Sequence, residues 1–484
     1  MSPLSRTLSV LCLVAFGGGC ASHTGGTAAA TPAVLATAPA ATAASPSAVD
    51  AALLERRIAA HLRFLASDAL NGRGSGTRDE WIAATYAGAQ LTSLGLEPLG
   101  DDGWFVQEVG VQRFKAAAPP VLTAGERTYT RNTAFLLNSV GAARLAGPLR
   151  HFVAGTPVPP GAAVILPADA PMAAMTTLTG AALVLRKASA TQASNWAQLT
   201  SQASEWLLTQ IVGTPLTPPS GPTVLTLDAA THEAITAMAD GTALRLDTEL
   251  VAGDRTRTWN VVGRLPGTDP SASAEAVILS AHLDHLGMRP GRSDDVSDVI
   301  YNGADDDASG VVAVLELARV LASGPRPRRP VVFALFGSEE SGGYGARYFV
   351  DRPVVPLGDI VADLQVEMIG RPDPKVPAGT LWLTGYERST LGPQLAARGA
   401  RLVQDPHPDQ RFFERSDNIR FARRGVVAHT VSSFGLHGEY HQPSDEFRHV
   451  NLAHMRDSIA SLVEPVRWLA TTTERPVWIE GKKP

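Results

Sequence analysis

Three predominantly apolar runs in the second half of the chain constrain the fold more than any other feature. They are AVILSA (276–281), VVFALF (331–336) and IVADLQV (360–366). Apolar runs of this length are typical of parallel strands that are buried on both faces. A helical run, VVAVLELARVLA (311–322), separates the first two. This order of strand, helix and strand predicts an α/β domain with a mainly parallel central sheet flanked by helices.

Histidine and carboxylate side chains follow each of these runs. In open α/β sheets the functional site lies outside the carboxyl ends of the strands, so we expect these side chains to converge at one edge of the sheet. The candidates are His282, Glu339, Glu340 and Glu367 after the three runs, Asp305, Asp306 and Asp307 in NGADDDASG, and His441 in GEYHQPSD. Any one of them alone is more often a turn or capping residue. Their common position after predicted strands is what indicates a site.

The donor types predict a metal centre. Imidazole and carboxylate ligands without thiolates suit Zn, Mn or Co. A single catalytic zinc needs three protein ligands, whereas this set has two histidines and at least four carboxylates, which indicates two ions. Two such ions bridged by one carboxylate can activate a water and polarise a scissile carbonyl. A separate carboxylate must then accept the proton of that water, and the adjacent Glu339 and Glu340 could divide the two tasks in either order.

The motifs themselves resemble one known family. AHLDHLG, GADDDASG, the Glu339–Glu340 pair, the strand end EMIG and YHQPSD resemble those of the co-catalytic di-zinc aminopeptidases, a family that includes bacterial leucyl aminopeptidases and the glutamate carboxypeptidase group. The resemblance covers roughly 51–115 and 255–470, and LRFLASDALNGRGSGT (62–77) resembles the family's N-terminal segment. It implies a zinc exopeptidase fold and two Zn²⁺ ions, with Co or Mn as possible substitutes.

The resemblance also implies a role for each matching residue. His282 and Glu367 would bind the first zinc, Glu340 and His441 the second, and Asp306 both, through a segment whose Asp306–Asp307 peptide bond the family pattern implies to be cis. Leucyl aminopeptidases have Asp where this chain has Glu367. Glu339 would be the general base, Asp284 would orient His282, and Tyr440 would donate a hydrogen bond to the oxyanion. His285, His437 and His449 receive no role.

The chain divides into six predicted segments. These are a signal peptide (1–20), a flexible linker (21–50), the first part of the peptidase domain (51–115), an inserted β-rich domain (116–254), the zinc peptidase catalytic domain (255–475) and a C-terminal tail (476–484). Residues 116–254 contain short β-like runs and few chemistry-bearing residues. They occupy the place where this family often carries an inserted protease-associated domain.

The N-terminus indicates export. Arg6, the apolar stretch 8–16 and the small residues before Cys20 resemble a bacterial lipoprotein signal, in which Cys20 would be lipidated. Residues 21–50 are nearly all Ala, Thr, Pro, Ser and Gly, which is typical of a flexible spacer. Ala21 resembles the outer-membrane sorting pattern, so we expect an outer-membrane lipoprotein on the periplasmic face of the bacterial envelope. The alternative is an ordinary secretory signal cleaved after a small residue.

Composition excludes several other classes of protein. The 42 Lys and Arg residues against 47 Asp and Glu give a formal charge of −5, which excludes a strongly basic nucleic-acid binder. No apolar run approaches the ~18–20 residues of a membrane span, so an integral transporter or channel is not expected. The only cysteines are Cys12 and Cys20, which leaves the body of the protein without a disulfide scaffold or a cysteine-based metal site.

The sequence therefore predicts a zinc metallopeptidase that removes N-terminal amino acids from peptides and contacts the membrane only through Cys20. Three alternatives stay open: a carboxypeptidase of the glutamate carboxypeptidase type, a glutaminyl-cyclase-like enzyme with one zinc, and a non-catalytic binding protein on the same fold. Arg411, Arg415 and Arg420 keep the carboxypeptidase open, because arginines bind a terminal carboxylate. The sequence leaves the oligomeric state and the preferred side chain of the substrate undecided.

Overall fold

The computed structural model describes residues 48–137, 144–170, 178, 180–201, 203–214, 222–289 and 297–484. The predicted signal peptide, Cys20 and all but the last three residues of the predicted linker lie outside this part of the chain. The first helix, α1 (Ala48–Leu65), begins inside the predicted linker, with Asp50 in its first turn. Within the described part, no helix has the length and apolar character needed to cross a membrane.

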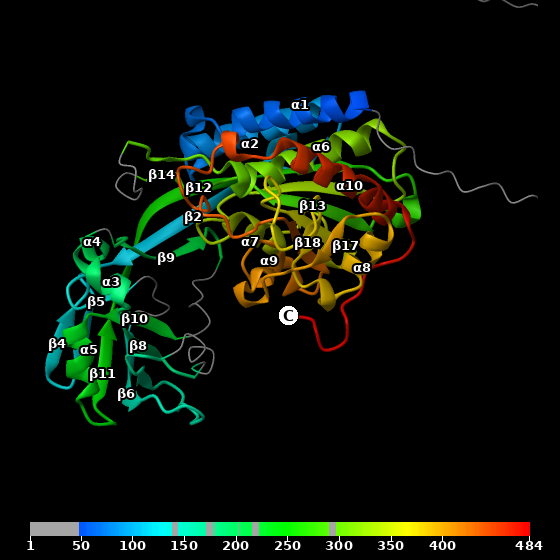
Figure 1. Ribbon diagram of the computed structural model, residues 1–484. Helices are drawn as coiled ribbons and strands as arrows, with labels where there is room; N and C mark the ends of the chain where they lie inside the picture. Colours follow the sequence, from blue (N-terminus) through cyan, green and yellow to red (C-terminus); the bar gives the residue numbers. More distant parts are fainter. Residues whose placement is uncertain are drawn as a thin grey trace, which may run out of the picture. The chain divides into compact units, whose positions relative to one another are not determined.

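A ten-stranded sheet forms the centre of the fold (Figure 1). Its neighbouring strands run in the order β19-β18-β20-β17-β13-β16-β12-β2-β9, and β1 pairs with β12. The bounds are β1 Glu97–Pro98, β2 Val106–Ala116, β9 Trp206–Ile211, β12 Leu250–Leu265, β13 Ala276–His282, β16 Val331–Phe336, β17 Ile360–Val366, β18 Leu381–Leu383, β19 Leu402–Gln404 and β20 Ala428–Ser432.

The sheet is mixed, and its parallel strands lie in the middle. The pairs β16–β13, β13–β17 and β17–β20 are parallel, as is β18–β19 towards one edge. In contrast, β12, β2 and β9 pair antiparallel on the other side, and β18 pairs antiparallel with β20. The apolar runs predicted only the central strands. Strand β12 has exposed or half-buried side chains along most of its first half, so it left no such run. A strand of that kind leaves no continuous apolar run in the sequence.

Helices cover both faces of this sheet, as the predicted strands require. Val277, Leu279 and Ala281 of β13 pack with helices α1, α2, α6 and α10, whereas Ile278 of the same strand packs on the opposite face with α7 and α9. The alternation of neighbouring residues between two cores is the two-residue period of a strand buried on both faces. The helices are α2 Arg78–Ser93, α6 Gly310–Ser323, α7 Tyr344–Asp351, α8 Leu391–Ala397, α9 Asn418–Ala422 and α10 Leu452–Thr471.

An eight-stranded sheet with its own apolar core forms from residues 121–247 (Figure 1). Its strands are β3 Val121–Ala124, β4 Arg127–Thr130, β5 Phe135–Leu137, β6 Arg144–His151, β7 Ala163–Ile165, β8 Leu183–Lys187, β10 Thr223–Leu227 and β11 Ala243–Asp247, with helices α3 Ala190–Ser194, α4 Trp196–Ser201 and α5 Ala229–Thr236. Strand β9 comes from the same stretch of sequence but pairs with β2 in the larger sheet. The division into domains at residues 116 and 254 stays a prediction.

A buried carboxyl group in β17 of the ten-stranded sheet gives the folded state a pH dependence. Asp363 on β17 is fully buried, accepts a hydrogen bond of 2.7 Å from the Ser280 hydroxyl, and has its second oxygen without a partner in the described part. Burial raises the pKa of Asp363 to about 7, against an unperturbed value of about 3.9. The folded state therefore binds the proton more tightly, and this group's contribution to stability falls as the pH rises from about 4 to above 7.

We expect Asp363→Asn, which keeps the shape and removes the charge, to stabilise the protein at pH 8 by an amount of the order of a few kcal/mol and to have a much smaller effect at pH 5. Thermal unfolding of the variant and the wild type at both pH values measures the difference. An equal shift in Tm at pH 5 and pH 8 would show that Asp363 is not the titrating group.

Candidate metal centre

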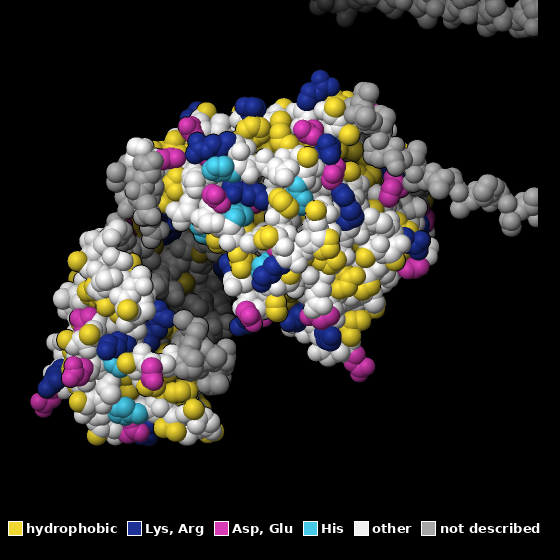
Figure 2. Space-filling model, viewed as in Figure 1, with side chains coloured by type: hydrophobic (Ala, Val, Ile, Leu, Met, Phe, Trp, Pro, Cys, Tyr) yellow, Lys and Arg dark blue, Asp and Glu magenta, His cyan; other side chains and the backbone are white. Residues whose placement is uncertain are grey.

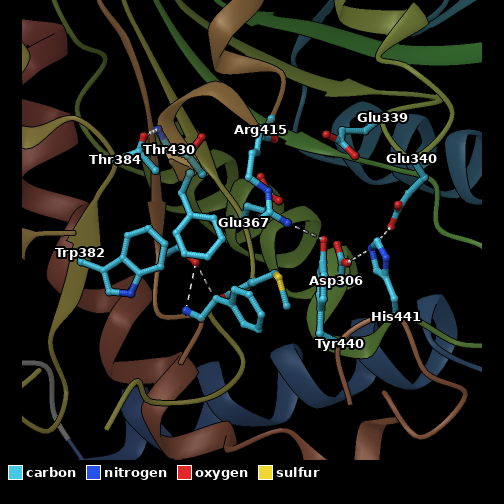
Figure 3. A pocket seen from close by; sticks show the side chains of 15 residues that line it. Asp306, Glu339, Glu340, Glu367, Trp382, Thr384, Arg415, Thr430, Tyr440 and His441 are labelled. Carbon is cyan, nitrogen blue, oxygen red and sulfur yellow. Dashed lines mark hydrogen bonds and ion pairs between the residues drawn. The ribbon is translucent and has the colours of Figure 1, made fainter. Parts of the chain in front are cut away.

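The predicted site residues lie at the carboxyl ends of three neighbouring parallel strands. His282 is the last residue of β13, Glu339 and Glu340 follow β16, and Glu367 follows β17. Asp306 precedes α6 in the short helical turn Ala304–Ser309, and the Asp306–Asp307 peptide bond is cis, as the resemblance implies. His441 comes from the loop between β20 and α10. Figure 3 shows Asp306, Glu340 and His441 pointing toward one another, with Glu339 and Glu367 beside them.

The middle one of the three consecutive aspartates faces the site, because the other two are occupied by backbone groups. The Asp307 carboxylate accepts hydrogen bonds from the N–H groups of His282, Gly310 and Met368 at 2.9–3.2 Å. Asp305 likewise accepts from the Gly370 N–H at 2.7 Å. Both carboxylates tie the turn to the strands on either side. The second oxygen of Asp305 contacts His437 Nε2 at 2.9 Å, so the Asp306 carboxylate is the one left to contact His282 and His441.

Asp306 stands between two groups of potential ligands. Its Oδ1 lies 3.0 Å from His282 Nε2, and its Oδ2 lies 3.2 Å from His441 Nε2. One group comprises His282, Asp306 and Glu367, with ligand atoms all within 4.8 Å of one another. The other comprises His285, Asp306 and Glu340, again within 4.8 Å. Asp306 thus offers one oxygen to each group, which is the arrangement of a carboxylate shared by two ions.

The residues present fit zinc. The donors are nitrogen and oxygen atoms at the separations expected of neighbouring ligands, and there is no thiolate. Three buried donor atoms in the second group, Glu340 Oε1 and both ring nitrogens of His285, have no hydrogen-bond partner in the described part of the chain. Because a buried polar atom without a partner costs free energy, these atoms indicate that the group is built around a ligand.

His441 completes the second group. Its Nε2 lies 3.2 Å from Glu340 Oε1 as well as from Asp306, and its ring is stacked on that of Tyr440. Burial lowers the pKa of His441, but the contacts with Asp306 and Glu340 outweigh it and raise this pKa to about 9. Burial raises the pKa of Glu340, but the contacts with His285 and His441 lower it to about 2. These shifts describe the His441 ring held against two carboxylates, and a metal cation suits the same carboxylates.

Glu339 lies in a different environment from its neighbour Glu340. Its carboxylate belongs to neither ligand group in the described residues, and burial raises its pKa well above the usual value, despite the opposing influence of His282. A carboxylate that is not a ligand and whose pKa is raised toward neutrality has the properties of a general base.

Asp284 holds the loop that carries Glu339. The Glu339 N–H donates to Asp284 Oδ1 at 2.9 Å, and the Ser75 hydroxyl donates to the same carboxylate. The predicted orientation of His282 by Asp284 involves the backbone, because His282 Nδ1 lies 3.2 Å from the Asp284 carbonyl oxygen and 3.9 Å from the carboxylate. Asp284 is fully buried, and its contacts hold the end of β13 against the loop that follows β16.

The segment GRGSGTRDE (72–80) also supports the site, although none of its residues is among the predicted site residues. Glu80 is fully buried and accepts hydrogen bonds from the Ser338 N–H at 3.1 Å and the Thr258 hydroxyl at 2.6 Å. The buried Arg73 donates to four backbone carbonyls, those of Leu65, Leu283, Asn302 and Gly303. The only sequence signal for this support was the resemblance of residues 62–77 to the family's N-terminal segment.

A pocket of about 250 Å³ opens beside the ligand groups (Figure 3). Its apolar lining comes from Met368, Trp382, Phe412 and Phe434, which pack on one another. Arg415 also lines it, with its guanidinium 5.0 Å from the centre of the Phe412 ring and 3.4 Å from the Tyr440 hydroxyl, to which it donates. Burial raises the pKa of Tyr440, so this hydroxyl keeps its proton. An apolar pocket with a few polar groups beside a reactive centre is typical of a substrate site.

Comparison with known proteins finds a family model that matches the segment carrying this site. Residues 260–464 match the model of peptidase family M28. The chain is 30% identical over 168 residues to a probable lipoprotein aminopeptidase, LpqL, of Mycobacterium tuberculosis (34% of this chain and 26% of that protein). It is 30% identical over 118 residues to leupeptin-inactivating enzyme 1 of Streptomyces exfoliatus (24% of each chain). The matched segments therefore span about a quarter of the length of these two relatives.

The solved structure of an aminopeptidase from Aneurinibacillus sp. strain AM-1 has the same fold. It superposes with a TM-score of 0.52 over 87% of this chain and 95% of that one, at 18% sequence identity. The predicted α/β fold is thereby confirmed. Residues 260–464 are therefore similar to a peptidase family M28 domain, and the histidine–carboxylate groups lie within this matched segment.

Proposed function

We propose that this protein is an aminopeptidase that uses two zinc ions to hydrolyse N-terminal amino acids from peptides. The observation that carries the proposal is the position of Asp306, which directs one carboxylate oxygen to His282 and the other to His441. Glu340 adds to the second side and Glu367 to the first. The similarity to an aminopeptidase of Mycobacterium tuberculosis supports the choice of terminus.

The protein's own residues suit the steps of peptide hydrolysis. Zinc, when bound, supplies the Lewis acidity that activates the attacking water and polarises the scissile carbonyl. A Glu339 carboxylate oxygen accepts the proton of that water and passes it to the leaving amine nitrogen. The Tyr440 hydroxyl, which keeps its proton, donates a hydrogen bond to the developing oxyanion. Trp382 and Phe412, stacked with ring centres 5.4 Å apart, form an apolar wall for the substrate side chain.

A panel of peptides with free, N-acetylated and C-amidated ends tests the proposal with the zinc-loaded protein. We expect cleavage of free and C-amidated peptides, with release of the first amino acid, and loss of cleavage on N-acetylation. Release of N-terminal residues from acetylated peptides at an undiminished rate would exclude an aminopeptidase.

A carboxypeptidase is the second candidate, because one arginine in the pocket is free to bind a carboxylate. Arg415 lines the pocket and forms no ion pair with any described residue. Arg411 does not line this pocket and pairs with Glu414. Guanidinium groups bind carboxylates through paired hydrogen bonds. If this reading is correct, C-amidation abolishes cleavage and N-acetylation does not, which is the reverse of the result expected above.

We propose that the protein is exported and held at the periplasmic face of the outer membrane by a lipid on Cys20. The relative in Mycobacterium tuberculosis is a probable lipoprotein, and the predicted spacer at 21–50 would let the enzyme stand away from the membrane. Acidic and basic side chains are interspersed over the face seen in Figure 2, without an extended area of either charge.

Cys20→Ser should therefore move the protein from the membrane fraction to the soluble fraction without lowering kcat/KM. Fractionation with a high-salt wash and a peptidase assay on both fractions measure the two properties. Retention of the variant in washed membranes would indicate another means of attachment.

A further inference from the structure

His285 is fully buried and belongs to the second ligand group, but it is not among the residues to which the sequence assigns a role. Its Nδ1 lies 2.8 Å from Glu340 Oε1 and 3.9 Å from Asp306 Oδ2. Its ring is 5.8 Å from that of His441, at an angle of 65°, so that the two imidazoles approach the same carboxylates from different sides.

The contact between His285 and Glu340 is short but does not have the geometry of a hydrogen bond. Neither Nδ1 nor Glu340 Oε1 has a hydrogen-bond partner in the described part of the chain, although the two atoms are close enough for one. Two potential metal-ligand atoms that lie close together without a hydrogen bond between them are arranged as neighbouring ligands of one ion. Ligand atoms 2.0–2.1 Å from a tetrahedral zinc are about 3.3 Å apart, and closer in higher coordination.

The backbone around His285 holds the ring in this place. The His285 N–H donates to the Arg73 carbonyl at 3.1 Å. Gly303 adopts a left-handed conformation (φ 58°), and a Cβ at that position would collide with the His285 ring and the Asp306 carbonyl. A fully buried imidazole without a hydrogen bond is costly, so a fixed ring with an unpartnered nitrogen needs a ligand.

We propose that Nδ1 of His285 is a ligand of the second zinc, which the protein then holds through Asp306, Glu340, His441 and His285. The loop that follows β13 thus contributes a ligand to the second site, in addition to the segments that carry Asp306, Glu340 and His441. This inference rests on the zinc-binding part of the proposed function. It predicts a second site with more nitrogen ligands than the first.

Cobalt spectroscopy of His285→Cys tests the proposal directly. A thiolate bound to Co²⁺ gives a strong charge-transfer absorption in the near ultraviolet, whereas a thiol near the ion without a bond to it gives none. We expect this band in the Co²⁺-loaded full-length variant and in the positive control His441→Cys. It should be absent from the wild type, whose only cysteines are Cys12 and Cys20, and from the matched control His449→Cys.

The metal affinity of His285→Ala provides a second measurement. Zinc titration against a chelator should show the second site weakened by at least the 10–100-fold that is typical when even an indirect support of a metal ligand is removed. The site that contains His282 should keep its affinity, and the circular dichroism spectrum should be unchanged. If His285→Cys does not fold, the same titration of His285→Asn replaces the spectroscopic test.

Two results would overturn the inference. One is a Co²⁺-loaded, folded His285→Cys without the charge-transfer band while His441→Cys shows it. The other is an unchanged zinc affinity of both sites in His285→Ala or His285→Asn. A wild-type protein that binds no zinc at all would instead contradict the proposed function, so the two failures are distinguishable.

Discussion

Replacing Glu339 by Gln should lower kcat by about 10²–10⁴-fold while KM changes little, because general acid–base catalysis by one group contributes that much. The amide keeps the size and shape of the side chain but cannot accept the proton of the attacking water. Zinc binding should survive, since the Glu339 carboxylate belongs to neither ligand group in the described residues. Steady-state kinetics and the zinc content of the purified variant measure both effects.

Glu340→Gln is the matched control, because it makes the same chemical change at the neighbouring residue. Glu340 Oε1 lies 3.2 Å from His441 Nε2 and 2.8 Å from His285 Nδ1, so its loss should lower the zinc content as well as the activity. If Glu339→Gln loses zinc and Glu340→Gln keeps it, the two roles are exchanged.

Removal of metal should abolish hydrolysis completely, and Zn²⁺ or Co²⁺ should restore it. The wild type should bind two ions per chain, and His282→Ala and His441→Ala should each lower this number, because each removes a nitrogen ligand on a different side of Asp306. Dialysis against a chelator, reconstitution, and measurement of metal content alongside activity test these expectations.

The metal count also separates the remaining alternatives. One zinc per chain in a protein active on N-terminal glutamine would favour a cyclase-like enzyme, and bound zinc without hydrolysis of any peptide would favour a binding protein. Full peptidase activity after exhaustive chelation would contradict the metal-dependent mechanism itself.

The central strands could be predicted from the sequence because their burial leaves a local signal. Residues 276–281, 331–336 and 360–366 are apolar apart from Ser280, Asp363 and Gln365, since each strand faces helices on both sides. The candidate ligands after these strands followed from the same reasoning, because parallel strands end at one edge of the sheet. The antiparallel strands β2, β9 and β12 left no such run, and their pairing with the central strands was not predicted.

The sequence by itself determined the type of domain, the donor chemistry and the loops that carry it. Only the tertiary structure decided how Asp306 divides its two oxygens between His282 and His441, and why Asp305 and Asp307 face backbone N–H groups instead. It alone placed His285 against Glu340 and Glu80 beneath the Ser338 N–H. The physical reason is that these contacts join segments far apart along the chain, and their geometry depends on the packing of the strands and helices that bring those segments together.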